Sequence, residues 1–171
     1  TINIADGSDL DLTGKTFTDI DAIYINALGT SDNSITGSSG VDVITGNSGV
    51  NTIGLSSGSD IINSGGGADI IEAGVGDKVD AGSGNDVITI NAAATTLNGG
   101  ADADTLVIDT ASINFASTTI SNIENVNVNQ NSDLSGKFTG GETTLATLTT
   151  AIGKTTTLAG ADVTSETVSL A

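Results

Sequence analysis

Oxygen-bearing side chains recur every nine residues through the middle of the chain. Residues 28–107 divide into nine consecutive units, of which the sixth is one residue short. With the short unit taken to lack its fifth residue, the sixth positions are Asn33, Asp42, Asn51, Asp60, Asp69, Asp77, Asp86, Thr95 and Asp104. Carboxylates stacked at one phase of a repeat would repel one another unless a cation lay between them. Because Ca²⁺ takes about six to eight oxygen ligands in a flexible geometry, the spacing predicts several bound Ca²⁺ ions.

The composition leaves little other chemistry open. The 171 residues include no Cys, His or Met, which excludes thiol or Ser-His catalysis and nitrogen or sulfur sites for zinc or copper. Four Lys and Arg residues against 21 Asp and Glu residues give a net charge of −17, so nucleic-acid binding through a basic face is also excluded. No apolar run approaches the roughly 18 residues of a membrane span.

The eighth position of every unit is aliphatic, and this pattern indicates the fold class. These residues are Ile35, Ile44, Ile53, Ile62, Ile71, Val79, Ile88, Leu97 and Leu106. Nine residues are two and a half helical turns, so a helix would place successive members on opposite faces. A Gly-rich turn followed by a short strand repeats every nine residues instead. The array is therefore predicted to be a β-solenoid.

Disorder is the competing interpretation of a chain with this charge and only 2% aromatic residues. The absence of Pro and the short β-forming runs, such as residues 60–62 and 69–71, count against disorder.

The units resemble a known repeat. Residues 40–44, 67–71 and 84–88 fit the GxDxU core of GGxGxDxUx, the nonapeptide of the RTX (repeats-in-toxin) family. The resemblance covers residues 28–107 and implies an all-β fold, a right-handed parallel β-roll. In such a roll each nonapeptide forms one turn and one short strand, and two nonapeptides complete a coil. The resemblance also implies Ca²⁺ between stacked turns, held by sixth-position carboxylates and backbone carbonyls.

Two nonapeptides per coil sort the sixth positions into two columns. The first column is Asp42, Asp60, Asp77 and Thr95, and the second column is Asn33, Asn51, Asp69, Asp86 and Asp104. Four neighbouring pairs then hold two carboxylates: Asp42 with Asp60, Asp60 with Asp77, Asp69 with Asp86, and Asp86 with Asp104. The asparagines keep an oxygen but lose the charge, so their sites are expected to be weaker. A metal-free Asn ladder is the open alternative for Asn33 and Asn51.

The flanks are expected to be metal-free β-solenoid coils that cap the array. Residues 17–26 align without gaps to residues 120–129, and both segments alternate apolar and polar residues as half-buried strands do. We therefore divide the chain into an N-terminal cap (1–27), the β-roll (28–107), a C-terminal cap (108–139) and a Thr-rich β segment (140–171). An uncleaved secretion signal is the alternative interpretation of the Thr-rich segment.

No enzymatic role is expected. The acidic pairs Asp19 with Asp21 and Asp102 with Asp104 are the arrangement closest to a glycosidase, but solvated or metal-bound carboxylates explain them better. Ice binding is disfavoured because the outward positions lack a continuous row of hydroxyl groups.

The composition is similar to that of bacterial surface-layer proteins, which are acidic, free of Cys and rich in Thr, Ala, Gly and Asn. We therefore expect a calcium-dependent structural module of a secreted bacterial cell-surface protein, of the surface-layer or adhesin type. The resemblance to the RTX family implies that it would pass through a type I secretion channel unfolded and then fold on Ca²⁺ outside the cell. Its partners would be calcium ions and either further copies or neighbouring domains, through outward apolar pairs such as Val43 with Ile61. The alternative is the secretion and folding module of an RTX protease or lipase.

Overall fold

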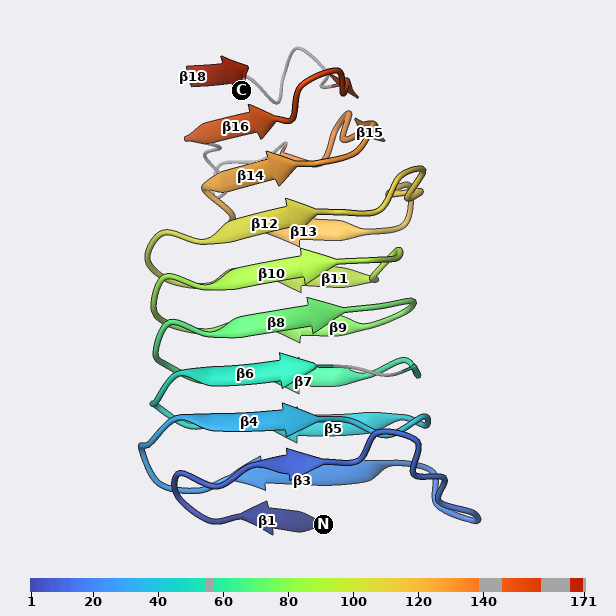
Figure 1. Ribbon diagram of the computed structural model, residues 1–171, viewed down its shortest axis with the longest axis vertical. Coiled ribbons are helices and arrows are strands. Elements are labelled where there is room, and N and C mark those ends of the chain that lie inside the picture. Colours follow the sequence, from blue (N-terminus) through green and yellow to red (C-terminus); the bar gives the residue numbers. More distant parts are fainter. Residues whose placement is uncertain (55–56, 139–145, 158–166, 171) are drawn as a thin grey trace.

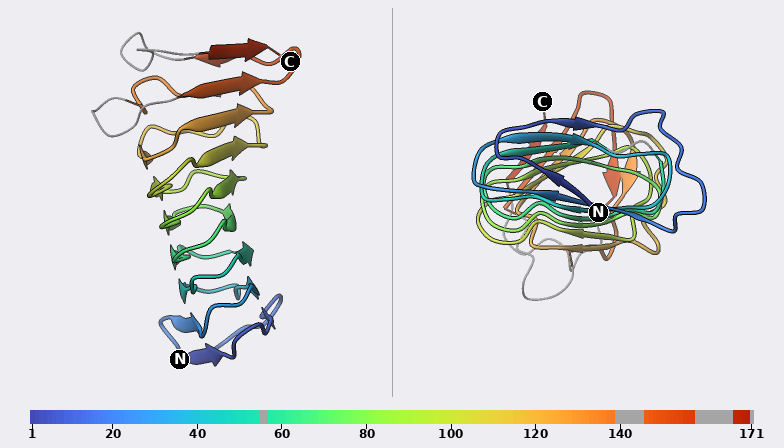
Figure 2. Two further views of the ribbon diagram at one scale, coloured as in Figure 1. Left: turned by 90° about the vertical axis from the view of Figure 1, so that its left-hand side faces the viewer. Right: turned by 90° about the horizontal axis from the view of Figure 1, so that it is seen from below.

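The computed structural model describes residues 1–54, 57–138, 146–157 and 167–170. Within them the chain forms short parallel strands and turns, without a helix, wound into a stack of coils (Figure 1). The view along the long axis shows the coils superimposed around a shared interior (Figure 2). The expected all-β solenoid is therefore confirmed. Accordingly, no helix long and apolar enough to cross a membrane occurs in these ranges.

Two parallel sheets face each other across the solenoid. The seven-stranded sheet contains β1 (Ile2–Ile4), β3 (Ile23–Ala27), β5 (Asp42–Thr45), β7 (Ile61–Asn63), β9 (Lys78–Asp80), β11 (Thr96–Asn98) and β13 (Thr119–Ser121). The nine-stranded sheet contains β2 (Leu10–Asp11), β4 (Asn33–Thr36), β6 (Asn51–Gly54), β8 (Ile70–Ala73), β10 (Val87–Ile90), β12 (Thr105–Ile108), β14 (Asn125–Val128), β16 (Thr147–Thr150) and β18 (Thr167–Leu170). The chain crosses from one sheet to the other after each strand, so neighbours in a sheet are two repeats apart.

The strand register confirms the repeat phase. Ile44 pairs with Ile62, and Ile62 pairs with Val79, although the unit that contains Val79 is one residue short. Every eighth-position side chain between Ile35 and Leu106 is at most 2% exposed. These side chains form two apolar columns between the sheets, and burying each one stabilises the fold by roughly 1.5–3 kcal/mol. The aliphatic period thus builds the core and fixes where the turns lie.

The sheets continue beyond the repeats at both ends. In the N-terminal flank β1 pairs with β3, and in the C-terminal flank β12 pairs with β14 and β14 with β16. The two similar flank segments lie in different sheets, one forming β3 and the other β14. The segment expected to be Thr-rich β-structure forms β16, β17 (Thr156–Thr157) and β18 where it is described; residues 140–145, 158–166 and 171 lie outside the described residues.

The seven-stranded sheet ends at β13. The next strand on that side, β15 (Ser132–Asp133), pairs with β17 in a separate two-stranded sheet. The C-terminal flank therefore keeps one sheet continuous and interrupts the other.

Candidate metal-binding columns

The structure assembles both columns of sixth-position residues at the turns that precede the strands. The first column stands where the chain enters the seven-stranded sheet, and the second stands where it enters the nine-stranded sheet. Asn33, Asp42, Asn51, Asp60, Asp69, Asp77, Asp86 and Asp104 are all buried, with at most 3% of each residue exposed. Eight polar residues, six of them carboxylates, are thus withdrawn from water in a strongly acidic chain.

Backbone hydrogen bonds join neighbouring members of each column. The N–H of a sixth-position residue donates to the side-chain oxygen of the sixth-position residue one coil later. In the first column Asp42 donates to Asp60 Oδ1 at 2.8 Å, and Asp60 donates to Asp77 Oδ1 at 2.9 Å. In the second column the bonds run from Asn51 to Asp69, Asp69 to Asp86 and Asp86 to Asp104, at 2.7, 2.7 and 2.9 Å. One oxygen of each accepting carboxylate is thereby used.

The second oxygen of four carboxylates has no partner. Oδ2 of Asp60, Asp69, Asp86 and Asp104 is buried and accepts no hydrogen bond within the described residues. A buried carboxylate oxygen without a donor is costly, and native proteins rarely leave one in that state. These four atoms are therefore where a cation would be stabilised most.

Burial also shifts the proton equilibrium of these acids. It raises the pKa of Asp60 to about 7, assisted by the charges of Asp77 and Asp42 and opposed by the Asp42 N–H. It raises the pKa of Asp86 to about 7 and that of Asp104 to about 6, and the pKa of Asp69 in the same direction. A positive ion beside these groups would favour their ionised form instead.

Asp42 and Asp77 are satisfied by their own turns. Oδ2 of Asp42 accepts the Ser38 N–H at 2.7 Å, and the Ser38 hydroxyl lies 3.1 Å from the same oxygen. Oδ2 of Asp77 accepts the Gly74 N–H at 2.6 Å. Within the first column, Asp60 Oδ2 is therefore the carboxylate oxygen for which the described residues provide no donor. Thr95, the last member of that column, donates its hydroxyl to the Asp77 carbonyl at 2.9 Å.

The Asn51 side chain places an amide donor among the oxygens of the turns in the second column. Its Nδ2 donates to the Gly49 carbonyl at 2.8 Å, to the Ser64 carbonyl at 3.2 Å and to Asp69 Oδ1 at 3.2 Å. With Asn47 Oδ1 at 3.4 Å, four oxygens from two coils thus surround one amide nitrogen. Where the column carries Asp in place of Asn, no side-chain N–H is present to occupy that position, and an oxygen-binding cation fits there.

The other asparagines of these turns behave as Asn51 does. Nδ2 of Asn33 donates to the Ser8 carbonyl at 2.5 Å, and Nδ2 of Asn47 donates to Asn33 Oδ1 at 2.8 Å and to the Ser31 carbonyl at 2.9 Å. These side chains link the first coils by amide hydrogen bonds. Asn33 and Asn51 thus use their amide groups as donors, while Oδ1 of Asn51 is buried and accepts no hydrogen bond within the described residues.

The turn backbones stack closely enough to supply carbonyl ligands. Gly84 has φ +120°, and a Cβ there would overlap the Gly67 carbonyl oxygen one coil earlier. Across the described ranges no three acidic side chains converge on one point, so a metal site needs backbone carbonyls to complete its ligand set. Beside Asp60 and Asp77 a cavity of about 170 Å³, lined also by Gly74 and Asn91, leaves room for an ion and water. The donor set of oxygens alone suits Ca²⁺.

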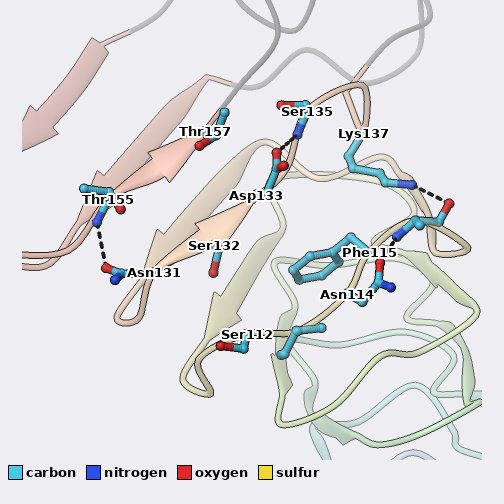
Figure 3. A pocket seen from close by; sticks show the side chains of 12 residues that line it. Ser112, Asn114, Phe115, Asn131, Ser132, Asp133, Ser135, Lys137, Thr155 and Thr157 are labelled. Atoms are coloured by element: carbon cyan, nitrogen blue, oxygen red, sulfur yellow. Dashed lines mark hydrogen bonds between the residues drawn. The ribbon is translucent and has the colours of Figure 1, made fainter.

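A larger hollow of about 600 Å³ lies in the C-terminal flank, where β15 departs from the seven-stranded sheet (Figure 3). Lys137 crosses it and donates to the Ala116 and Thr118 carbonyls at 3.2 and 3.0 Å. The Asp133 carboxylate accepts the Ser135 N–H at 3.0 Å, and hydrogen bonds from Ser135 lower its pKa. These hydrogen bonds hold the loop that carries Asp133 and Lys137 and join it to the segment that contains Ala116 and Thr118.

The second column has a further member that the repeat spacing does not indicate. Glu124, in the C-terminal flank, accepts the Asp104 N–H on Oε2 at 2.8 Å, as Asp104 accepts the Asp86 N–H. It follows Asp104 by twenty residues, outside the nine-residue period, and it is Glu where the pattern has Asp. The register of β12 with β14, which places Thr105 opposite Asn125, reveals it.

Residues 28–53 and 55–77 match the family model of the RTX calcium-binding nonapeptide repeat, in four copies. In these two segments the chain contains RTX calcium-binding nonapeptide repeats. No curated protein and no solved structure matches it. The RTX match ends at residue 77, whereas the columns continue through Asp86 and Asp104, each with an unpaired buried oxygen. The structure thus extends the RTX-like turns beyond the matched residues.

Proposed function

We propose that this chain is a calcium-dependent structural module of a secreted bacterial cell-surface protein, of the surface-layer or adhesin type. RTX repeats bind calcium and occur in secreted proteins. The observation that carries the proposal is the set of four buried, unpaired carboxylate oxygens at Asp60, Asp69, Asp86 and Asp104. The acidic, Cys-free composition supports a cell-surface location.

Each proposed site uses two carboxylates and the turn carbonyls between them. The four pairs are Asp42 with Asp60, Asp60 with Asp77, Asp69 with Asp86, and Asp86 with Asp104. Bound Ca²⁺ supplies positive charge to oxygens that otherwise face each other. The chain positions those oxygens through the backbone hydrogen bonds that join neighbouring members of each column, which we call the hydrogen-bond ladder. Each of these bonds engages one oxygen of the accepting carboxylate, and the other oxygen is directed away from the bond. Asn33 and Asn51 we assign to the metal-free Asn ladder.

The buried acids make the fold responsive to calcium. A pKa of about 7 at Asp60, against an ordinary value of 3.8, means that ionising this group in the metal-free fold costs about 4 kcal/mol. Asp86 carries a similar cost. Since a folded domain is stable by only about 5–15 kcal/mol, these costs are large enough to decide whether the array folds without calcium.

Calcium titration tests the proposal directly. Circular dichroism in chelator should show less β-structure than in calcium, because the metal-free array is only marginally stable, and sub-millimolar to millimolar Ca²⁺, typical of extracellular modules, should restore the full signal. A spectrum that is the same in chelator and in calcium would refute the proposal.

Outward apolar residues support contact with neighbouring copies or domains. Ile61 is paired with Val43 on the outer face of the seven-stranded sheet, and Ile70 is paired with Val87 on that of the nine-stranded sheet; Ile61 and Ile70 are 45% and 48% exposed. Light scattering during the calcium titration separates the outcomes. The double variant Ile61→Thr, Ile70→Thr should keep calcium-dependent folding and lose association. Association that persists in this variant would remove these pairs from the proposal.

A further inference from the structure

Glu124 extends the second column one coil beyond the last nonapeptide. The register of β12 with β14 places Leu106 opposite Val126, and therefore Glu124 beside Asp104. The bond from the Asp104 N–H to Glu124 Oε2, at 2.8 Å, repeats the bond from Asp86 to Asp104 at 2.9 Å. The flank thus presents a carboxylate at the same place as a repeat does.

Oxygens of the last repeat and the flank face the same space. Asp104 is fully buried and its Oδ2 has no hydrogen-bond partner. This oxygen lies 2.5 Å from the position that a Cβ on Gly99 would occupy, and the carbonyl oxygen of Asn122 lies closer still to that position. The side chain of the repeat and the backbone of the flank therefore converge next to Gly99.

The coil that contains Asn51 has the same arrangement of a glycine, a carbonyl of the next coil and a sixth-position side chain, but there the side chain is an amide that donates a hydrogen bond. There the Ser64 carbonyl lies against Gly46, as the Asn122 carbonyl lies against Gly99, and the Asn51 amide donates to it. At the other end of the column the corresponding side chain is Asp104, which offers only oxygens when ionised. A cation takes the place that the amide nitrogen has beside Gly46.

We propose that Asp104, Glu124 and the Asn122 carbonyl form a further divalent-cation site, of the Ca²⁺ type, that joins the last repeat to the C-terminal flank. Asp102 is near enough for its charge to act on Asp104 and adds to the negative potential. The site rests on the proposed calcium-dependent function, but half of its side-chain ligands come from outside the repeats. Its role is to fix β14, and the coils that follow, to the roll.

Glu124→Gln tests the site because glutamine keeps an oxygen for the Asp104 N–H and removes only the charge. Asp80→Asn is the matched control. It removes one charge from an exposed residue on the outer face of the seven-stranded sheet, where Asn98 Nδ2 donates to it at 2.9 Å. Bound Ca²⁺ per chain is measured by equilibrium dialysis, and amide protection of Asn125–Val128 by hydrogen exchange.

We expect Glu124→Gln to bind one ion fewer than the wild type and to lose the calcium-induced protection of β14, while Asp80→Asn matches the wild type. Asp104→Asn should bind two ions fewer, because Asp104 would serve both Asp86 and Glu124. Unchanged stoichiometry in Glu124→Gln, or a loss of one ion in Asp104→Asn, overturns this site and leaves the repeat sites standing. A wild-type chain that binds no calcium overturns the proposed function itself.

Discussion

Asp60 and Asp42 are adjacent in the first column, and neutralising them should have unequal effects. In Asp60→Asn the side-chain oxygen can still accept the Asp42 N–H, which is bonded at 2.8 Å in the wild type. The amide then replaces Oδ2, the oxygen that accepts no hydrogen bond from the described part of the chain. The substitution therefore removes a buried charge without removing a hydrogen bond.

The size of the effect follows from the pKa of Asp60. Burial raises it from 3.8 to about 7, so at pH 8 the ionised group costs the metal-free fold about 4 kcal/mol. Asp60→Asn should recover up to about that amount in chelator. In calcium the same variant loses a ligand shared by two proposed sites, and the calcium midpoint should rise by roughly tenfold or more.

Asp42→Asn is the control. The Ser38 N–H donates to Asp42 Oδ2 at 2.7 Å, so the charge of this carboxylate is already stabilised within its turn. Removing it weakens that charge-assisted bond and should give no gain in chelator. Because Asp42 belongs to one proposed site, the calcium midpoint should rise less than in Asp60→Asn.

Urea unfolding at pH 8 in chelator measures the first effect, and calcium titration by circular dichroism measures the second. Equal unfolding free energies and equal midpoints for the two variants would refute both the assignment of the unpaired oxygen and the sharing of Asp60.

Two other predictions concern acid and the Asn ladder. The folded-state pKa values of Asp60 and Asp86, about 7, exceed the ordinary value of 3.8, so the stabilisation of the fold by their protonation is complete below about pH 4 and is lost as the pH rises through 7. Metal-free protein should therefore gain β-structure, measured by circular dichroism, when the pH is lowered from 8 to 5. A loss of β-structure over that range would contradict the assignment. Asn51→Asp should bind one calcium ion more than the wild type, with Asp69 as the second carboxylate. In chelator it should be less stable by about 1–3 kcal/mol, because the four oxygens around the amide lose this donor. A variant with unchanged stoichiometry would speak against a cation at that position.

The nine-residue period was enough to predict a β-solenoid, and the resemblance to the RTX nonapeptide implied that neighbouring strands are two units apart. The eighth-position aliphatics indicate the phase, and Val79 keeps that phase despite the short unit because its apolar side chain has to enter the core between Ile62 and Leu97. Two sheets and two columns follow from this phase once two nonapeptides complete each coil.

The differences among the columns could not be predicted from the period. Asp42 and Asp60 look alike in the sequence, and only the fold of the turn shows that Ser38 bonds to one of them. The amide contacts of Asn51 depend on the Ser64 carbonyl of the next coil, thirteen residues away. Glu124 belongs to the column through strand register, which a nine-residue period does not convey.

The hydrogen-bond ladder gives the two ends of the roll different chemistry. Every sixth-position N–H from Asn51 to Asp104 in the second column donates toward the C-terminus, and Glu124 accepts the last bond. Removing coils from the C-terminal end would leave a buried donor without an acceptor, whereas removing them from the other end would leave an acceptor without a donor. The stack therefore has a polarity, and a second roll could continue the ladder only in head-to-tail order. Tandem copies joined in this way would form an open filament rather than a closed pair.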